Sequence, residues 1–450
     1  MKNKQTESLW RLSDRLRGAL EISELYKIML YGIFLKYIEH NQEDICSYDE
    51  KYSLEYLSLT YGKIVTLHEV LGYLGKIESE LSLDAGVLSE SFAQVFSRVD
   101  SENVRVMFEN LNELEMDSSE NCYQFALVIV NKMLTAVGKM GGEFGTNMAL
   151  AKLEKDILDV KKGMSVYDAY CGTGISVNEV AAGIGRVFLQ DINISSIGMA
   201  AIITVLSGNS IGAVRCADSL HNPIELKGQY DRIVCEPPFS LKYDKGYMES
   251  IVGGNCIYQE CLESESLALR HCIASLKDDG IAVVLVPMGM LFKSGRMGDV
   301  RRNLVEDSYI DTIIELPNGI VPGTAVATAL IVLKKNRKES EIMMINAKEF
   351  CAKVKMAVTI TDENIQRITE IYRNREIIEG VSNTITKEIA AENGYNLCTT
   401  QYVTLKASEG IVVEDNRKFI ENYEKLLQRL RNIDKELDEV RSRFVKELPV

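Results

Sequence analysis

The chain has few of the residues and spacings that mark disulfide-rich or metal-binding proteins. It contains only four histidines, and its ten cysteines include no Cys-x-x-Cys pair. Scattered single cysteines without ligand spacing indicate reduced thiols rather than a disulfide framework or a zinc site. We therefore expect a cytoplasmic protein that holds no metal ion.

The sequence also lacks a long hydrophobic run. Its most apolar early segment, KIMLYGIFLKYI, is interrupted by Lys27 and Lys36, whereas a membrane-spanning helix needs about 20 predominantly apolar residues. The first residues, MKNKQTESLW, do not lead into a signal-peptide core with a small-residue cleavage site. We expect no association with a membrane.

An excess of positive charge is missing as well. The formal net charge is −14, from 51 Lys and Arg against 65 Asp and Glu. This balance excludes indiscriminate nucleic-acid binding, because neutralising phosphates requires clustered cations. A role on DNA would need a local basic patch or a partner subunit.

Proline is absent from the first 140 residues, and glycine is sparse there. Apolar residues recur at three- and four-residue steps, as in Leu9, Leu12, Leu16 and Leu20. This spacing predicts an N-terminal helical domain, residues 1–140. A chain of 450 residues is in any case too long for one ordinary core.

From about residue 164, short apolar runs alternate with helical stretches, which predicts an α/β domain over residues 141–375 with a mostly parallel sheet and helices on both faces. The candidate strands are MSVYDAY, RVFLQDI, AVRCAD, DRIVCE, IAVVLVP, DTIIEL and TALIVLKK.

Residues 376–450 are predicted to be helical and highly charged. The last stretch carries apolar residues at steps of three and four between Ile420 and Phe444, which is typical of a coiled-coil-like helix that binds a partner. A helix folded back on its own domain is the alternative interpretation.

Three successive predicted strands each end in an aspartate. Asp168 precedes a turn that opens a helix through Gly172 and Gly174, Asp191 ends RVFLQD, and Asp218 follows the third strand. Gly-x-Gly alone would also fit a plain tight turn. However, ligands of open α/β sheets bind beyond the carboxyl ends of the strands, where these side chains are expected to meet.

Crowded carboxylates would repel a pyrophosphate and attract a sulfonium or an ammonium group. S-adenosyl-L-methionine is therefore a better candidate cofactor than NAD. We expect Asp168 near its methionine part, Asp191 near the ribose and Asp218 near the adenine amino group. The cofactor-binding residues predicted from these strand ends are Asp168, Gly172, Gly174, Asp191, Ile192, Asp218 and Ser219.

The fourth strand ends in CEPPFS, residues 235–240. Two consecutive prolines fix a rigid extended turn and expose carbonyl groups. A side-chain oxygen before them, together with a proline carbonyl, is able to accept both hydrogens of an amino group, and the aromatic ring after them is able to stack on a base rotated out of its duplex. The predicted catalytic residues are Glu236, Pro237, Pro238 and Phe239.

With this motif the chain resembles the N6-adenine DNA methyltransferases, specifically the modification subunits of type I restriction-modification systems, whose tetrad is usually Asn-Pro-Pro-Phe. Further similar segments follow one another in the family's order: LWRLSDRLRGALEISELYKIMLYGIFLKYIEH (9–40), GGEFGTNMALAKL (141–153), VPMGM…VLKKN (286–336) and AAENGYNLCTTQYV (390–403). The resemblance therefore covers nearly the whole chain.

The resemblance implies a Rossmann-like class I S-adenosylmethionine-dependent methyltransferase sheet that acts on double-stranded DNA. It also implies that Glu143, Phe144 and Thr146 contact the methionine end of the cofactor; Gly145 and Asn147 depart from the family's Gly-Glu-Phe-Tyr-Thr-Pro pattern. Partners implied by the family are a specificity subunit, a second methyltransferase subunit and a restriction or nuclease subunit.

Glu236 leaves two interpretations open. Glutamate offers the same kind of acceptor oxygen as asparagine on a side chain that is one methylene longer. In the first interpretation Glu236 accepts from the adenine amino group and the protein is an active methyltransferase. In the second, methyl transfer is lost and the protein is a scaffold or sensor subunit of a phage-defence complex.

Two basic segments are candidates for contact with DNA. The loop 241–261 carries two lysines and follows the predicted catalytic motif, so it is expected near the extruded base or its phosphates. Arg296, Arg301 and Arg302 are the candidate phosphate-facing patch. The alternatives are an ordinary surface loop and solvated helix charges.

Overall fold

The computed structural model describes residues 21–41, 45–114, 116, 118–137, 147–252, 257–258, 261–354 and 357–403. The chain divides into two units, Met1–Thr404 and Leu405–Val450, and all described residues belong to the first. The predicted C-terminal helix and the segment with Glu143, Phe144 and Thr146 lie outside the described residues.

The N-terminal part is helical, as predicted. Its central helix, α2 (Ile22–Asn41), is apolar on all sides, and Ile28, Met29 and Leu30 are fully buried, as expected for a helix surrounded by others. Among the described residues, no helix combines the length and apolarity needed to cross a membrane. The other elements are η2 (Glu50–Tyr52), α3 (Leu54–Thr60), α4 (Leu67–Glu80), α5 (Ser89–Phe96), α6 (Ser101–Asn112) and α7 (Ser119–Val137).

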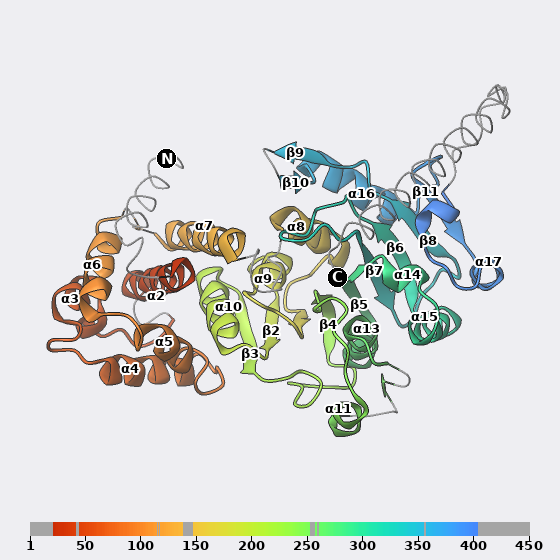
Figure 1. The fold of residues 1–450 in the computed structure, drawn as a ribbon. Helices are drawn as coiled ribbons and strands as arrows, with labels where there is room; N and C mark the ends of the chain where they lie inside the picture. Colours follow the sequence, from red (N-terminus) through yellow and green to blue (C-terminus); the bar gives the residue numbers. More distant parts are fainter. Residues whose placement is uncertain are drawn as a thin grey trace, which may run out of the picture. The chain divides into compact units, whose positions relative to one another are not determined.

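A nine-stranded sheet follows, in the order β11-β8-β6-β7-β5-β4-β1-β2-β3 (Figure 1). Strands β1 to β5 run parallel to their neighbours within this group, whereas β7 is antiparallel to β5 and β6, and β11 is antiparallel to β8. The strands are β1 (Ser165–Asp168), β2 (Arg186–Asp191), β3 (Ser210–Cys216), β4 (Tyr230–Cys235), β5 (Leu276–Pro287), β6 (Ile310–Glu315), β7 (Thr328–Lys334), β8 (Ile342–Asn346) and β11 (Ser382–Ile385), with a separate hairpin of β9 (Ala352–Val354) and β10 (Ala357–Thr359).

All seven predicted strands are confirmed, but four strands were not predicted. Strand β11 corrects the prediction of helical structure after residue 375, because residues 382–385 pair with β8 at the edge of the sheet. The segment SNTI has only one large apolar residue, so its sequence alone does not indicate a strand. Its strand conformation comes from the backbone hydrogen bonds with β8.

Helices cover both faces of the sheet, as predicted. The helical elements of this region are α8 (Met148–Leu158), α9 (Ile175–Ala181), α10 (Ile194–Leu206), α11 (Lys245–Ser250), α13 (Ser264–Ser275), α14 (Gly289–Phe292), α15 (Arg296–Glu306), α16 (Asp362–Asn374), α17 (Lys387–Glu392) and η3 (Thr399–Gln401). Alternate residues of β5 enter different cores. Val283 and Leu285 belong to the core that includes residues of α8, α9, α10 and α16, whereas Ala282 and Val284 belong to the core that includes residues of α13, α15 and α17.

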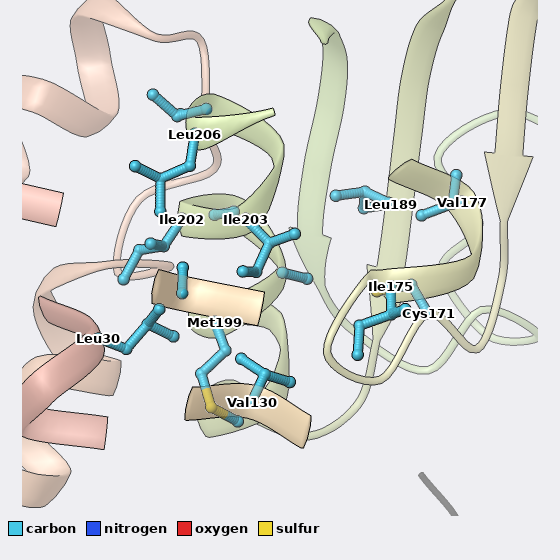
Figure 2. Close-up of a cluster of buried hydrophobic side chains, with 14 of the residues drawn as sticks. Leu30, Val130, Cys171, Ile175, Val177, Leu189, Met199, Ile202, Ile203 and Leu206 are labelled. Atoms are coloured by element: carbon cyan, nitrogen blue, oxygen red, sulfur yellow. The ribbon is translucent and has the colours of Figure 1, made fainter. Parts of the chain in front are cut away.

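Helix α10 joins the N-terminal helices to the sheet. Every residue from Ser195 to Leu206 is buried, because α10 contacts α2, α5 and α7 as well as β2 and β3. Figure 2 shows Met199 near Leu30 of α2 and Val130 of α7. The helical region and one face of the sheet therefore share a single hydrophobic core.

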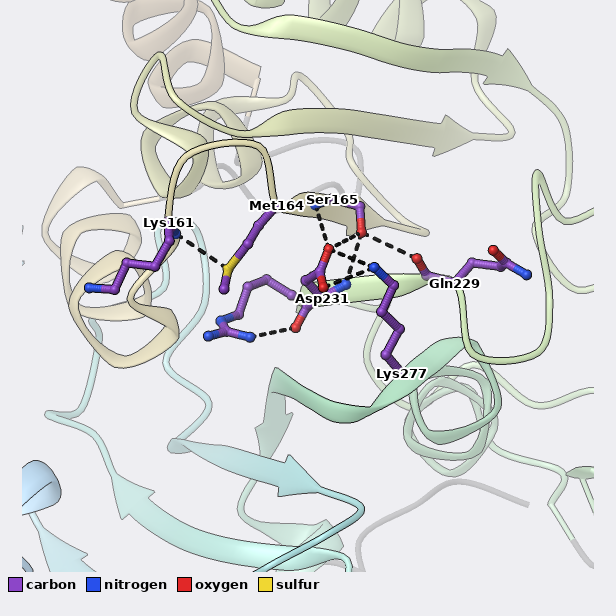
Figure 3. Close-up of polar contacts among 7 residues, drawn as sticks. Lys161, Met164, Ser165, Gln229, Asp231 and Lys277 are labelled. Atoms are coloured by element: carbon purple, nitrogen blue, oxygen red, sulfur yellow. Dashed lines mark hydrogen bonds and ion pairs between the residues drawn. The ribbon is translucent and has the colours of Figure 1, made fainter.

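The N-terminal ends of β1 and β4 are fastened by Asp231 (Figure 3). Its Oδ2 accepts from Ser165 N at 2.8 Å and from Ser165 Oγ at 2.7 Å, and Lys277 Nζ lies 2.9 Å from Oδ1. Burial opposes ionisation, but these hydrogen bonds and Lys277 lower the pKa of Asp231 below its usual value. This polar cluster fixes the strands at the end opposite to their carboxyl tips.

Candidate active site

The carboxyl ends of β1 to β4 surround a cavity of about 430 Å³. A volume of this size suits a small-molecule ligand. Of the predicted site residues, those that line it are Asp168, Gly172, Asp191, Ile192, Asp218, Ser219, Glu236, Pro237, Pro238 and Phe239. Four separate chain segments therefore line one cavity, as expected from the rule that ligands of open α/β sheets bind at the carboxyl ends of the strands.

Gly172 and Gly174, in the turn after β1, have different structural roles. Both have positive φ, +51° at Gly172 and +76° at Gly174. A Cβ on Gly172 would meet nothing within 4 Å, so its backbone faces open space. A Cβ on Gly174 would lie 2.9 Å from the Cβ of Ala200, so this glycine allows α9 to pack against α10. Gly174 does not line the cavity, in contrast to its predicted role.

Asp191 holds the glycine turn in place. Its Oδ2 accepts from Gly172 N at 2.9 Å, and its Oδ1 accepts from Asn193 N at 2.8 Å. The following residue, Ile192, is 72% exposed although it is apolar. A carboxylate beside an exposed aliphatic side chain offers an acceptor for hydroxyl groups and a flat apolar contact for a ring.

Asp168 is almost completely buried at the tip of β1. Tyr170 N donates to its Oδ1 at 3.0 Å. Burial raises the pKa of Asp168 well above its usual range, and the neighbouring carboxyl groups of Glu236 and Asp191 raise it further. Such a group favours a cationic ligand, because an ammonium would relieve the crowding of negative charge.

The Asp218 carboxylate makes three contacts with other residues of the chain. Leu220 N donates to Oδ1 at 2.9 Å, while Tyr247 Oη donates to Oδ2 at 2.8 Å and His221 Nδ1 lies 2.9 Å from the same oxygen. Burial opposes the effect, but these contacts lower the pKa of Asp218. Since a carboxylate has about four acceptor positions, the three observed contacts leave room for one ligand amino group.

Aromatic side chains of the loop after β4 also line the cavity. Tyr243 and Tyr247 are stacked, with ring centroids 4.3 Å apart. Contact of this loop with the extruded base or its phosphates stays a prediction; among its described residues, tyrosines rather than the exposed lysines line the cavity.

The turn at the tip of β4 is fixed by the start of α13. Ser264 Oγ donates to the Pro238 carbonyl at 2.5 Å, and Glu265 Oε1 accepts from Ser240 N at 2.6 Å. Ser240 itself has a φ of +57°. The prolines and these side-chain contacts together hold the backbone that carries Glu236.

The Glu236 side chain lines the cavity and is held from a second direction. Ser176 Oγ donates to Glu236 Oε1 and also lies 3.1 Å from Oε2 of Glu154, a fully buried residue of α8. Burial and the nearby Glu236 carboxyl raise the pKa of Glu154 well above its usual range. Sequence reasoning missed both Ser176 and Glu154.

The residues that line the cavity are acidic rather than basic. Among the described residues that line it there is no Lys, Arg or His, whereas four carboxyl groups belong to Asp168, Asp191, Asp218 and Glu236. This donor set fits S-adenosyl-L-methionine, whose sulfonium and ammonium groups are cationic, and disfavours a pyrophosphate.

The predicted basic patch on α15 is wrong for Arg301. This guanidinium is 3% exposed and donates to the carbonyls of Met290, Lys293 and Tyr395, so it fastens the chain internally. Arg302 lies over the Tyr395 ring, 5.4 Å from its centroid. Arg296 is exposed and remains the candidate for contact with a phosphate.

A scan against protein families finds that the N-6 DNA Methylase model matches residues 120–410. The chain belongs to the N-6 DNA methylase family. Methyl transfer from S-adenosylmethionine to adenine N6 is the chemistry of this family, and membership of the family favours the enzyme over the scaffold interpretation.

Similar curated proteins are methylase subunits of type I restriction enzymes. The MpnII methylase subunit of Mycoplasma pneumoniae is 21% identical over 514 residues, covering 91% of this chain and 92% of that protein. The MjaVII methylase subunit of Methanocaldococcus jannaschii is 27% identical over 412 residues, covering 85% of this chain and 68% of that protein.

The fold is shared with solved structures. The type I restriction-modification methyltransferase subunit from Streptococcus thermophilus matches with a TM-score of 0.74 and 21% identity, covering 89% of this chain and 99% of that one. The predicted α/β methyltransferase architecture is thereby confirmed.

Proposed function

We propose that the chain is the adenine-N6 methyltransferase subunit of a type I-like restriction-modification complex that acts in the cytoplasm, and that Glu236 takes the place of the usual asparagine as the acceptor for the adenine amino group. The observation that carries this proposal is the position of Glu236, whose carboxyl group lines the same cavity as the aspartates of β1 and β2 and the aspartate that follows β3.

The residues proposed to hold the cofactor lie on the β1 to β3 side of the cavity. Asp168 faces the ammonium of the methionine part, Asp191 accepts from the ribose hydroxyls, and Asp218 accepts from the adenine amino group. Ile192, Ser219 and the Gly172 backbone complete this side, and Glu143, Phe144 and Thr146 stay predicted contacts. When bound, S-adenosyl-L-methionine supplies an electrophilic methyl group on a sulfonium.

Glu236 and the diproline turn are proposed to orient the target nitrogen. The carboxylate of Glu236 and a carbonyl of the turn accept the two amino hydrogens, which directs the nitrogen lone pair towards the methyl position. Transfer would form one N–C bond in place of the C–S bond of the cofactor, and Glu236 would accept the proton that the nitrogen loses. Phe239 and Tyr243 offer aromatic surfaces on which an extruded base stacks.

Partner subunits are proposed to supply what this chain lacks. With a net charge of −14, the chain offers little attraction for double-stranded DNA by itself. The relatives in M. pneumoniae and M. jannaschii are named as subunits of type I restriction enzymes, which supports a specificity subunit as the main DNA reader. A second methyltransferase subunit and a nuclease subunit are the further partners.

The proposal is tested by transfer of a labelled methyl group to duplex DNA by the chain together with its specificity partner. We expect incorporation at adenine N6 by the natural protein. Glu236→Ala should lower the transfer rate by about 100-fold or more, because a displacement of about 1 Å in a reacting geometry already costs about 100-fold. S-adenosylmethionine binding, measured by calorimetry, should change less than about threefold, since Glu236 faces the base.

Absence of incorporation by the natural protein, alongside normal cofactor binding, would support the scaffold interpretation. Glu236→Asn then decides the cause. If asparagine creates activity, the glutamate silenced an otherwise competent site; if it does not, the proposed role of this cavity in methyl transfer is refuted.

A further inference from the structure

Two glutamates share one serine hydroxyl behind the catalytic turn. Ser176, on the first turn of α9, donates to Oε1 of Glu236 and lies 3.1 Å from Oε2 of Glu154. Ser176 is 3% exposed and Glu154 is 0% exposed. The cluster therefore has no direct access to solvent on the Glu154 side.

The proton count of this cluster is restrictive. A serine hydroxyl has one hydrogen and therefore makes one strong hydrogen bond as a donor. If both glutamates were ionised, one of the two contacts would bring two oxygen atoms together without a proton between them. A proton on one of the carboxyl groups gives each of the two contacts its own hydrogen.

The surroundings of Glu154 favour it as the protonated group. Its Oε1 has no hydrogen-bond partner among the described residues, and a buried carboxylate with an unpaired oxygen is costly. The titratable groups that face it are Glu236 and Asp168, both acidic, so no cation compensates a charge there.

Charged groups on α8 and on the elements packed against it make other contacts. Lys152 pairs with Asp362 of α16, and Lys155 pairs with Glu179 of α9. On β4, Arg232 donates to the Leu158 carbonyl at the end of α8. The stretch 281–287 of β5, which also packs on this helix, is apolar.

We propose that Glu154 and Ser176 are positioning residues of the methyltransferase site: Glu154, as a neutral acid, donates to Ser176 Oγ, and Ser176 donates in turn to Oε1 of Glu236. This directed chain keeps Glu236 ionised as an acceptor and fixes the longer glutamate side chain in one rotamer. The inference rests on the proposed function for its catalytic consequence, but not for the protonation of Glu154.

The first test needs no activity. Infrared difference spectra of the intact chain at pH 7, recorded as natural protein minus Glu154→Gln, should show the loss of one protonated-carboxyl C=O band. Glu179→Gln, which removes a surface glutamate paired with Lys155, is the matched control and should leave the band. Retention of the band in correctly folded Glu154→Gln protein would overturn the assignment.

The second test uses methyl transfer with the specificity partner. Ser176→Ala should lower kcat about 10- to 100-fold while KM for DNA and cofactor affinity stay within about twofold. Glu154→Gln preserves a neutral hydrogen-bond donor, so the acid limb of its pH profile should coincide with that of the natural protein. An ionised Glu154 would instead make this substitution shift the limb by about two pH units, because two charges this close interact strongly.

The outcomes separate the two proposals. An unchanged kcat in Ser176→Ala, or a shifted acid limb in Glu154→Gln, refutes the positioning chain while leaving the methyltransferase proposal intact. A natural protein without activity, in which Glu154→Gln still loses the carboxyl band, refutes the proposed function and supports the neutral acid.

Discussion

The cofactor side of the site makes a quantitative prediction for Asp191→Asn. The Asp191 carboxylate accepts from Gly172 N at 2.9 Å and from Asn193 N at 2.8 Å. Asparagine keeps one acceptor oxygen but turns the other into an NH₂ group that faces an N–H donor. The substitution therefore loosens the glycine turn and removes the anionic acceptor proposed for the ribose.

Hydrogen bonds to a charged group contribute about 1.5–3 kcal/mol each. Loss of one such bond to the ligand, with a less ordered glycine turn, should weaken binding by about 2–3 kcal/mol. The dissociation constant for S-adenosylmethionine should consequently rise about 30- to 150-fold. Isothermal calorimetry on the intact chain, with S-adenosylhomocysteine as a second ligand, measures this change.

Asp231→Asn is the matched control for Asp191→Asn. Asp231 has a similar set of backbone and side-chain donors, but it lies at the opposite ends of the strands (Figure 3). We expect the free energy of unfolding of the Asp231→Asn variant to be lower by about 1–3 kcal/mol. Its affinity for the cofactor should stay within about threefold of that of the natural protein.

The control also has a defined pH dependence. Because the folded pKa of Asp231 is lowered from 3.8, its contribution to stability is present above that pH and is lost as the pH falls through the folded pKa. Cofactor affinity of Asp191→Asn within threefold of the natural protein would refute the argument, as would an equal loss of affinity in Asp231→Asn.

Two further predictions concern stability, measured by urea unfolding. Gly174→Ala should lower the free energy of unfolding by about 2–4 kcal/mol, because it adds a steric contact with Ala200 to the strain of a positive φ. Gly208→Ala is the control: at a φ of +70° with nothing within 4 Å, it should lower the free energy of unfolding by only about 1–2 kcal/mol. Equal losses in the two variants would contradict the packing argument. Burial lowers the pKa of His271 to about 4, so the unfolded chain binds a proton at a higher pH than the folded chain does. The free energy of unfolding should therefore fall by up to about 3 kcal/mol as the pH drops from 6.5 towards 4. His271→Gln should flatten this pH dependence, and identical slopes in the two proteins would contradict the assignment to His271.

Much of the fold was predictable because strands that are buried on both faces have continuous apolar sequences. Strands β5 and β7, IAVVLVP and TALIVLKK, carry continuous apolar runs that few other structures require. Strand β11 was not predictable by the same rule, since it lies at the sheet edge and its stability comes from pairing with β8. Tertiary pairing decides such segments, not their own composition.

The site was predictable to the extent that strand tips determine it. Asp168, Asp191 and Glu236 each end or follow a recognisable strand, and the α/β topology brings them together. Glu154 belongs to a helix instead, and its position depends on how α8 packs on α9. The available signal was a glutamate within the apolar stripe of Leu150, Leu153 and Ile157, where a charged side chain has no ordinary structural reason to be.

The glutamate of the catalytic motif and the buried acid behind it explain each other physically. A side chain one methylene longer than asparagine has one more torsion to fix, and the turn contacts from Ser264 and Glu265 fix only the backbone. Ser176 supplies the missing constraint on the carboxyl group. However, a serine that donates forward to Glu236 needs a donor of its own, and in this apolar location a neutral Glu154 is the group that provides one. The conformation of the Glu236 side chain is thus fixed by contacts from α8, α9 and α13, and not by the four residues of the motif alone.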